Sequence, residues 1–347
     1  MFKRPVVFIV GAGASHELGL PLGVGLRDTI AGMVDFKFHG RQLQKGDADL
    51  LAILRRRYDS DKSDITRLNT YFRAGSDLFS TMSRFPSVDE ALHYWSERKE
   101  AVELGKVAIA QQLLQAERRS KIFNTNDPSR ANVVAAGGTW LIPFVEIAMS
   151  GLRQEDAGNA FQNVTVVNFN YDRVVEHFLY WSLQLKFKVS DEVAAKAVGG
   201  LKVIRPYGSL GALEWHDKST GIPYGTEPRD VDVCGLADEI RTYTEQTEGS
   251  KIREQISHAL EAAELVIFLG FGFHQQNASL LYPISGHHRP RTRQILGTVV
   301  KIDVHNHEPI IYNIQNAMGL RHRALLLPIS SVDLLSNLRP MISMTVG

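Results

Sequence analysis

The chain has 347 residues, and its 39 Lys and Arg against 38 Asp and Glu give a formal net charge of +1 at pH 7. This balance excludes a global field for binding nucleic acid or an anionic membrane, so any such contact would need a local patch. With 44% hydrophobic and 22% charged residues, the composition is that of a globular protein, neither disordered nor fibrous.

The chain has a single cysteine, Cys234, which excludes an internal disulfide and a four-thiolate zinc site. The apolar run Val6–Val10 near the N-terminus breaks at Gly11, too soon for the core of a signal peptide. No later stretch approaches the ~20 apolar residues of a membrane helix. We therefore expect a cytoplasmic protein with no membrane partner and no direct nucleic-acid contact.

Short, continuous apolar runs mark the predicted strands. Val6–Val10 leads into a glycine turn, and similar runs occur at Val164–Val167, Leu201–Ile204 and Leu265–Leu269, with a fifth candidate at Thr298–Val304. Continuous rather than alternating apolar runs indicate a parallel sheet that is covered by helices on both faces. The predicted fold class is α/β, with a doubly wound, Rossmann-like sheet.

A long segment between the first two strands carries little strand signal. We predict a helical insertion over residues 31–159, between two parts of a nucleotide-binding domain at 1–30 and 160–347. An insertion after the first glycine turn would lie at the carboxyl ends of the strands, where doubly wound sheets bind ligands, and could serve as a lid or in oligomerisation. Apolar residues at helical spacing occur in Leu50–Arg57, Val88–Leu104, Val107–Arg119 and Thr139–Leu152.

The glycine turn after the first strand is the first candidate for chemistry. In Gly11-Ala12-Gly13, backbone N–H groups at the start of a helix could approach a phosphate. His16 stands where the dinucleotide fingerprint has its third glycine, so this motif alone is equally compatible with a tight turn that binds nothing.

Several motifs in order resemble a known family. Residues 11–23, a GAGAS turn followed by Gly-x-Pro-x-Gly, resemble the opening of the sirtuin-like NAD-binding domains of bacterial antiphage defence. Residues 166–172 look like that family's Thr-Thr-Asn-Tyr-Asp, and residues 207–210 like its His-Gly-Ser-Leu. Residues 268–273 look like its Gly-Tyr-Gly-Phe, and residues 87–92 resemble the acidic helix start that is common in its insertion.

The lack of further cysteines selects one branch of this family. Protein-deacetylating sirtuins carry a four-cysteine zinc module, whereas this chain has only Cys234. The resemblance is thus to the zinc-free branch, as in Thoeris-type and HerA-associated effectors. It implies an NAD+ glycohydrolase that forms nicotinamide and ADP-ribose and depletes NAD+ during abortive infection. It also implies a homo-oligomer and, as for some relatives, a HerA-type hexameric ATPase partner.

The resemblance assigns roles to individual residues. Asn170 would act in catalysis, its amide holding the ribose hydroxyls or the attacking water, and Asp172 would anchor the local turn. Alternatively, these residues form only a turn and a helix cap. Gly270 and Gly272 would receive the adenosine side of NAD+, or serve only strand-to-helix packing. The residues implied to bind NAD+ are Gly11, Ala12, Gly13, Ser15, Pro21, Gly208, Ser209, Gly270, Gly272 and Asn277.

The sequence departs from the family at Tyr207, where the usual residue is a histidine that acts on the ribose as a base. A free tyrosine titrates near pH ~10 against ~6.5 for histidine, a handicap of about 4 kcal/mol for a base at neutral pH. Tyr207 could still hydrogen-bond the ribose, and His216 or His274 could supply a base, although both also fit ordinary surface or structural histidines. A catalytically weak sensor of NAD+ or ADP-ribose therefore stays open as an alternative.

Two further segments have simpler interpretations. If the last predicted strand continued, Asp303, His305 and His307 would share one face that suits a divalent metal, and the letters His-Asn-His would suggest a nuclease. The surroundings lack a ββα-metal unit, so we expect no metal there and instead a contact of Asp303 with a ribose hydroxyl. The basic segment His287–Arg293 contains proline and predicts a solvated loop, inert or in contact with a phosphate or an acidic partner.

Overall fold

The strands outside the insertion form one parallel sheet. The computed structural model describes residues 1–58, 64–242, 245, 250–281, 294–318 and 324–347. In this part of the chain, six parallel strands lie in the order β5-β4-β1-β6-β7-β8. They are β1 (Val6–Val10), β4 (Val164–Asn168), β5 (Lys202–Ile204), β6 (Leu265–Leu269), β7 (Gln294–Thr298) and β8 (Leu325–Leu327).

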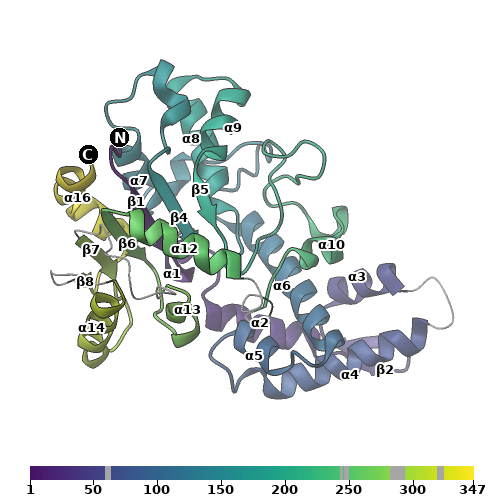
Figure 1. The fold of residues 1–347 in the computed structure, drawn as a ribbon. Helices are drawn as coiled ribbons and strands as arrows, with labels where there is room; N and C mark the ends of the chain where they lie inside the picture. Colours follow the sequence, from purple (N-terminus) through teal and green to yellow (C-terminus); the bar gives the residue numbers. More distant parts are fainter. Residues whose placement is uncertain (59–63, 243–244, 246–249, 282–293, 319–323) are drawn as a thin grey trace.

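The strand order is that of the Rossmann fold. The chain runs from the central strand β1 outward to β4 and β5, then returns to β6 on the other side of β1 and continues to β7 and β8 (Figure 1). The order therefore reverses between β1 and β6. In an open α/β sheet, ligands bind outside the carboxyl ends of the strands at this switch point.

Each face of β1 belongs to a separate hydrophobic core. Val7 and Ile9 join one buried cluster, and Val6, Phe8 and Val10 join the other. Because both faces are buried, the strand needs a continuous apolar run, as predicted from the sequence. The first face is covered by α12 (Ser250–Ala262) and α14 (His307–Met318). The second is covered by α7 (Leu141–Ala148), α8 (Val174–Phe187), α9 (Asp191–Gly199), α15 (Ser331–Asn337) and α16 (Arg339–Val346).

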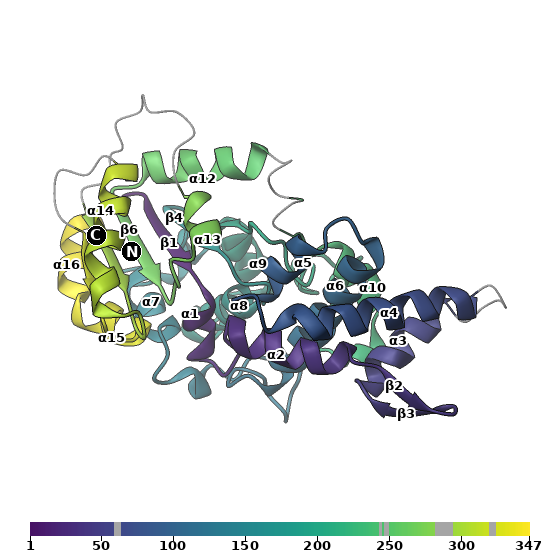
Figure 2. The ribbon, with the colours of Figure 1, turned by 90° about the horizontal axis from the view of Figure 1, so that it is seen from below.

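The insertion extends to one side of the sheet (Figures 1 and 2). Its helices share the first of the two cores with the sheet, through residues such as Leu92, Leu104 and Leu113. The chain enters it through α2 (Gly23–Val34), which begins before residue 31 and packs against α4 and α6. Its further elements are the hairpin β2 (Lys37–His39) and β3 (Gln42–Lys45), α3 (Ala48–Tyr58), α4 (Asp64–Met82), α5 (Val88–Tyr94) and α6 (Lys99–Arg119). The remaining helices are α1 (Ala12–His16), α10 (Val233–Asp238), α13 (Gln275–Ser279) and the short 3-10 turns η1 (Val134–Ala136), η2 (Gln154–Asn159), η3 (Pro228–Asp230) and η4 (Val304–Asn306).

The insertion differs from the prediction in several details. The predicted helix Val88–Leu104 is divided at residues 95–98, and α6 joins its second part to the predicted helix Val107–Arg119. The hairpin and α4 were not predicted. The predicted helix Thr139–Leu152 forms as the shorter α7, which packs with α8, α15 and α16 in the layer that covers the sheet.

The predicted strand Thr298–Val304 is wrong. The strand ends at Thr298, Lys301 adopts a positive φ of 60°, and Val304 begins a 3-10 turn. The Asp303 carboxylate accepts a hydrogen bond from the backbone N–H of His305 at 2.9 Å, which caps this turn. Asp303, His305 and His307 therefore do not share the face of a strand. Across the described ranges, no group of three or more His, Cys, Asp and Glu side chains could hold a metal ion.

No helix in the described residues is both long enough and apolar enough to span a bilayer. The basic segment His287–Arg293 lies outside the described residues.

Candidate functional site

Two glycine turns meet at the switch point. The N–H of Gly11 donates to the carbonyl of Leu269, and the N–H of Gly13 donates to the carbonyl of Gly270, both at 3.0 Å. A Cβ atom on Gly11 would lie 2.6 Å from the Gly270 oxygen, and one on Gly270 would lie 2.0 Å from the backbone nitrogen of Ala14. The glycines are thus required for direct backbone packing between the ends of β1 and β6.

This packing limits which backbone groups can reach a phosphate. The N–H groups of Gly11, Gly13 and Ala14 all donate to protein carbonyls, the last to that of Gly11 at 3.0 Å. Within the described residues, we find no acceptor for the N–H of Ala12, which is partly exposed at the start of α1. Of the predicted phosphate-binding N–H groups in the turn, Ala12 is therefore the clearest candidate.

Asn170 lies directly beside this turn. Its Nδ2 donates to the Gly11 carbonyl at 3.0 Å and to Ser15 Oγ at 2.8 Å. Because a backbone carbonyl can only accept, the bond to Gly11 fixes which amide atom is the nitrogen. The Nδ2 is thereby engaged, and in the described part of the chain no donor is found for Oδ1. The atom of Asn170 that is available to a ligand is therefore Oδ1, a hydrogen-bond acceptor whose orientation is fixed by the two bonds of Nδ2.

Asp172 completes a polar cluster with Ser15 and Asn170. The Ser15 side chain hydrogen-bonds the carboxylate of Asp172, whose Oδ1 also accepts from the N–H of Val174 at 3.3 Å. Burial raises the pKa of Asp172 to about 6, while the Ser15 bond and the charge of Arg205 oppose the rise. The structure thus joins three predicted residues in one chain of contacts from Asn170 through Ser15 to a buried carboxyl group.

Tyr207 and Asn277, predicted for different parts of NAD+, contact each other. The hydroxyl of Tyr207 donates to Asn277 Oδ1 at 2.6 Å, which connects the loop after β5 to α13. Tyr207 is buried, and Arg205, two residues before it, donates to the carbonyl of Asn170 at 2.9 Å. Gly208 takes a positive φ of 74°, and a Cβ there would lie 1.9 Å from the Glu239 carbonyl. The tight turn alone therefore explains why residue 208 is a glycine. Ser209 follows Gly208 in the same loop.

The remaining predicted residues are exposed or partly exposed. His216 is exposed and stacks on Trp215, whose ring stacks on Tyr180 of α8; no contact with the Asn170 cluster is found among the described residues. His274 is exposed at the start of α13, and a Cβ on Gly272 would meet its side chain at 2.9 Å. Pro21 precedes α2 and is partly exposed. Asp303 is exposed in the turn after β7.

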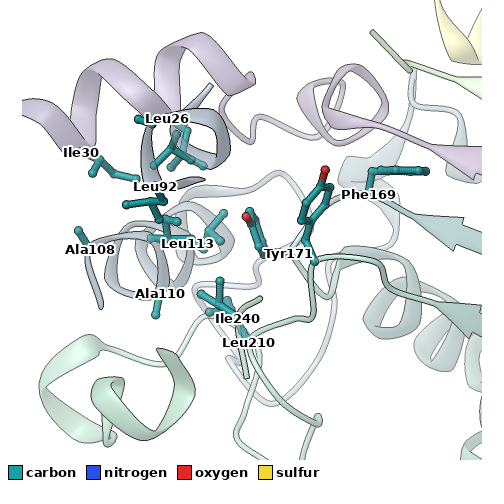
Figure 3. Close-up of a cluster of buried hydrophobic side chains, with 14 of the residues drawn as sticks. Leu26, Ile30, Leu92, Ala108, Ala110, Leu113, Phe169, Tyr171, Leu210 and Ile240 are labelled. Atoms are coloured by element: carbon teal, nitrogen blue, oxygen red, sulfur yellow. The ribbon is translucent and has the colours of Figure 1, made fainter. Parts of the chain in front are cut away.

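Aromatic side chains pack against one another next to the cluster. Phe169 packs against Phe271 with ring centroids 5.0 Å apart and against Tyr207 at 6.2 Å, and Tyr171 also lies 6.2 Å from Tyr207. Figure 3 shows Phe169 and Tyr171 between the end of the sheet and insertion side chains such as Leu92. These rings are thus buried against one another at the carboxyl ends of the strands.

Two cavities lie away from this cluster. One of about 660 Å³ lies near the amino end of β1 and is lined in part by Phe2, Lys3 and Ile147. A smaller apolar cavity of about 50 Å³ lies between α13 and α14, lined in part by Phe273 and Ile314. Neither is lined by residues of the Asn170 cluster, so volume alone does not identify the site.

Sequence reasoning did not foresee two acidic contacts near the site. Tyr171 donates a hydrogen bond from its hydroxyl to Asp89, at the start of α5 in the insertion. Glu17 accepts from the N–H groups of Trp140 at 2.8 Å and Ser331 at 2.7 Å, and so caps the segments that begin α7 and α15. The acidic start of α5 was noted as a motif, but nothing in the spacing pointed to Tyr171 as its partner.

The comparisons with known proteins add no family assignment. No family model matches the chain, and no curated protein matches it either. The membership in the sirtuin-like family therefore stays a prediction, and the Rossmann-like α/β fold is what the structure establishes.

Proposed function

We propose that the protein is an NAD+ glycohydrolase that cleaves NAD+ to nicotinamide and ADP-ribose, in the setting of bacterial antiphage defence. The observation that carries this proposal is the meeting of Ser15, Asn170 and Asp172 beside the two glycine turns at the switch point of the sheet. The resemblance predicted these residues from motifs more than 150 positions apart in the sequence.

The oriented amide suits the charge that the reaction develops. When the bond between nicotinamide and ribose breaks, its electron pair leaves with the neutral nicotinamide, and positive charge remains on the ribose. With Nδ2 of Asn170 held by Gly11 and Ser15, its Oδ1 offers the negative end of an amide dipole to this charge, to a ribose hydroxyl or to the attacking water. Water adds to the ribose carbon and releases one proton.

Asp172 would keep this amide in place. Its carboxyl group has a pKa of about 6 and is therefore mostly ionised at neutral pH, so it accepts the Ser15 hydrogen bond and leaves the Ser15 oxygen free to accept from Asn170. The Ala12 N–H would contribute to binding the pyrophosphate, where a hydrogen bond to a charged acceptor is worth about 1.5–3 kcal/mol.

The packed rings beside Asn170 and the buried Tyr207 support slow hydrolysis by the isolated chain. Tyr207 is a poor base, and its hydroxyl already donates to Asn277. We therefore propose that a trigger or a partner, such as a second copy of the chain or a hexameric ATPase, moves these rings apart. The same observation favours the second candidate, a sensor that binds NAD+ or ADP-ribose without cleaving it.

The two candidates are separated by incubating the full chain with NAD+, with and without a candidate ATPase partner, and measuring nicotinamide by mass spectrometry. We expect the wild type to release nicotinamide, and Asn170→Ala to release it at least about 100-fold more slowly, since a misplaced catalytic group lowers the rate by roughly this factor. Asn306→Ala, in the exposed turn η4, is the control and should retain the wild-type rate. Binding of NAD+ that is recovered intact under every condition would support the sensor and contradict the enzyme.

A further inference from the structure

A carboxylate from the insertion contacts the strand loop that carries the proposed catalytic residues. Asp89 lies in the first turn of α5, next to its capping residue Ser87, whose Oγ accepts from the N–H of Glu90 at 3.2 Å. The hydroxyl of Tyr171 donates to Asp89 Oδ1. The cap fixes the start of α5 and so fixes where the Asp89 carboxylate is presented.

Tyr171 occupies a central position in the site. It stands between Asn170 and Asp172 in the chain, and its carbonyl accepts from the N–H of Leu210 at 3.3 Å. Its ring lies 6.2 Å from that of Tyr207, and Figure 3 shows it beside the insertion core. The Tyr171 side chain therefore receives contacts from the insertion and from the loop after β5 at once.

The pair has the character of a functional contact rather than a stabilising one. Burial raises the pKa of Asp89 to about 6, with the negative charge of Glu90 acting in the same direction. Asp89 is partly buried, and no Lys or Arg partner of it is found among the residues that the structure describes. Removing a carboxylate from water without a cation to pair it is unfavourable for folding. Costly buried carboxyl groups of this kind concentrate at functional sites.

Building on the proposed function, we propose that Asp89 is a positioning residue for NAD+ cleavage, which holds Tyr171 and thereby the backbone that presents the Asn170 amide. The insertion then completes the site rather than merely covering it. A shift of α5, produced by whatever binds the insertion, would move Asn170 through this single hydrogen bond. Asp89 does not touch the substrate in this account.

The test uses the full chain and NAD+, with four variants compared for kcat and KM. Asp89→Ala and Tyr171→Phe each remove the hydrogen bond and should lower kcat by about 10- to 100-fold, with KM changed by less than about threefold. Asp89→Asn keeps an acceptor oxygen and should restore most of the lost kcat. The variant that combines Asp89→Ala with Tyr171→Phe should be no slower than either alone, because both remove the same contact.

A matched control exists in the same insertion. Glu103 accepts hydrogen bonds from the hydroxyls of Tyr58 and Tyr71 in a comparable carboxylate–tyrosine contact, away from the Asn170 loop. Glu103→Gln should leave kcat within about twofold of the wild type. If Asp89→Ala folds and retains wild-type kcat, or if its effect adds to that of Tyr171→Phe, the proposal is overturned.

A structural readout separates this inference from the proposed function. If the wild type releases no nicotinamide, NAD+ cleavage fails as the function, and the crystal structure of Asp89→Ala decides whether Asp89 positions the site. Displacement of the Asn170 amide from Gly11 and Ser15 supports the positioning role. An Asn170 amide that keeps both hydrogen bonds at their present lengths of 3.0 and 2.8 Å overturns it.

Discussion

At the residue scale, the backbone at Gly270 admits no side chain. Its φ is +56°, and an added Cβ would lie 2.0 Å from the nitrogen of Ala14 in the facing turn. We predict that Gly270→Ala lowers the free energy of unfolding by about 2–5 kcal/mol, the sum of a left-handed backbone penalty and overpacking.

Denaturant unfolding of two variants checks this prediction. Gly272→Ala is the matched control, because its new Cβ would meet only the exposed side chain of His274, which can rotate away. We expect the control to change the unfolding free energy by less than about 0.5 kcal/mol. Equal effects of the two substitutions would contradict the close approach of the glycine turns.

The buried carboxyl group of Asp172 predicts a pH dependence of stability. Its pKa is about 6 in the folded protein, above the ordinary value of 3.8. The favourable contribution of the protonated form is thus complete below pH 3.8 and is lost as the pH rises through 6. Relative to Asp172→Asn, the wild type should gain about 2–3 kcal/mol of unfolding free energy between pH 7 and pH 4.

The measurement is denaturant unfolding of both proteins at several pH values. Asp217→Asn supplies a control of opposite sign, because hydrogen bonds from Ser219 and Thr220 lower the pKa of the partly exposed Asp217. The wild type should lose stability relative to that variant as the pH falls. A stability difference between wild type and Asp172→Asn that does not change with pH would refute the raised pKa.

Motifs in the sequence name candidates for the site, whereas the contacts between them could not be predicted. Motifs pointed to Ser15, Asn170 and Asp172, and the structure brings these three together. The N–H groups of Gly11 and Gly13 donate to carbonyls at the end of β6. These bonds depend on how two turns far apart in the sequence pack together, and no local sequence pattern predicts that packing. The same holds for the contact between Tyr207 and Asn277.

At the element scale, a buried ion pair joins the insertion to the sheet domain. Glu117, in the last turn of α6, accepts from Arg173 Nη2 at 2.7 Å and Nε at 3.1 Å, and also from the N–H of Gly225 at 3.1 Å. Both side chains are almost fully buried. Removing one charge would strand the other in the core.

We predict that Glu117→Gln lowers the free energy of unfolding by about 3–5 kcal/mol, as is typical for breaking a buried ion pair. The exposed pair of Arg339 and Glu146, with a separation of 2.7 Å, is the control, and Glu146→Gln should cost less than about 1 kcal/mol. Denaturant unfolding measures both. If Glu117→Gln proves as mild as the control, α6 is not anchored by this pair.

The elements that could be predicted differ from those that could not in how they bury apolar residues. The strands β1 and β6 are continuous apolar runs, and β4 is interrupted only by Thr165 before it ends at Asn168, so their sequence pattern is clear. In α4, Leu68, Tyr71, Leu78 and Met82 do follow helical spacing and are buried, so a signal was present. The hairpin of β2 and β3 is exposed almost throughout and offers no such pattern. The prediction of a strand at Thr298–Val304 was wrong because the strand ends at Thr298 and the residues after it lie in turns.

At the scale of the whole molecule, the strand order places the candidate site. The reversal between β1 and β6 brings two glycine turns together, and the β4 loop adds Asn170 beside them. The insertion contributes Asp89 and part of the core that packs beside Tyr171. This arrangement is the basis for the proposal of slow NAD+ cleavage that a trigger or a partner accelerates.

The most direct measurement is a crystal structure of the Asn170→Ala variant, which should bind NAD+ without cleaving it, grown with the dinucleotide. The account predicts the ribose next to nicotinamide at position 170 and the pyrophosphate within hydrogen-bond distance of the Ala12 N–H, with the aromatic rings of Phe169 and Tyr207 displaced. NAD+ bound at another surface, with the rings still closed over the end of β4, would contradict it.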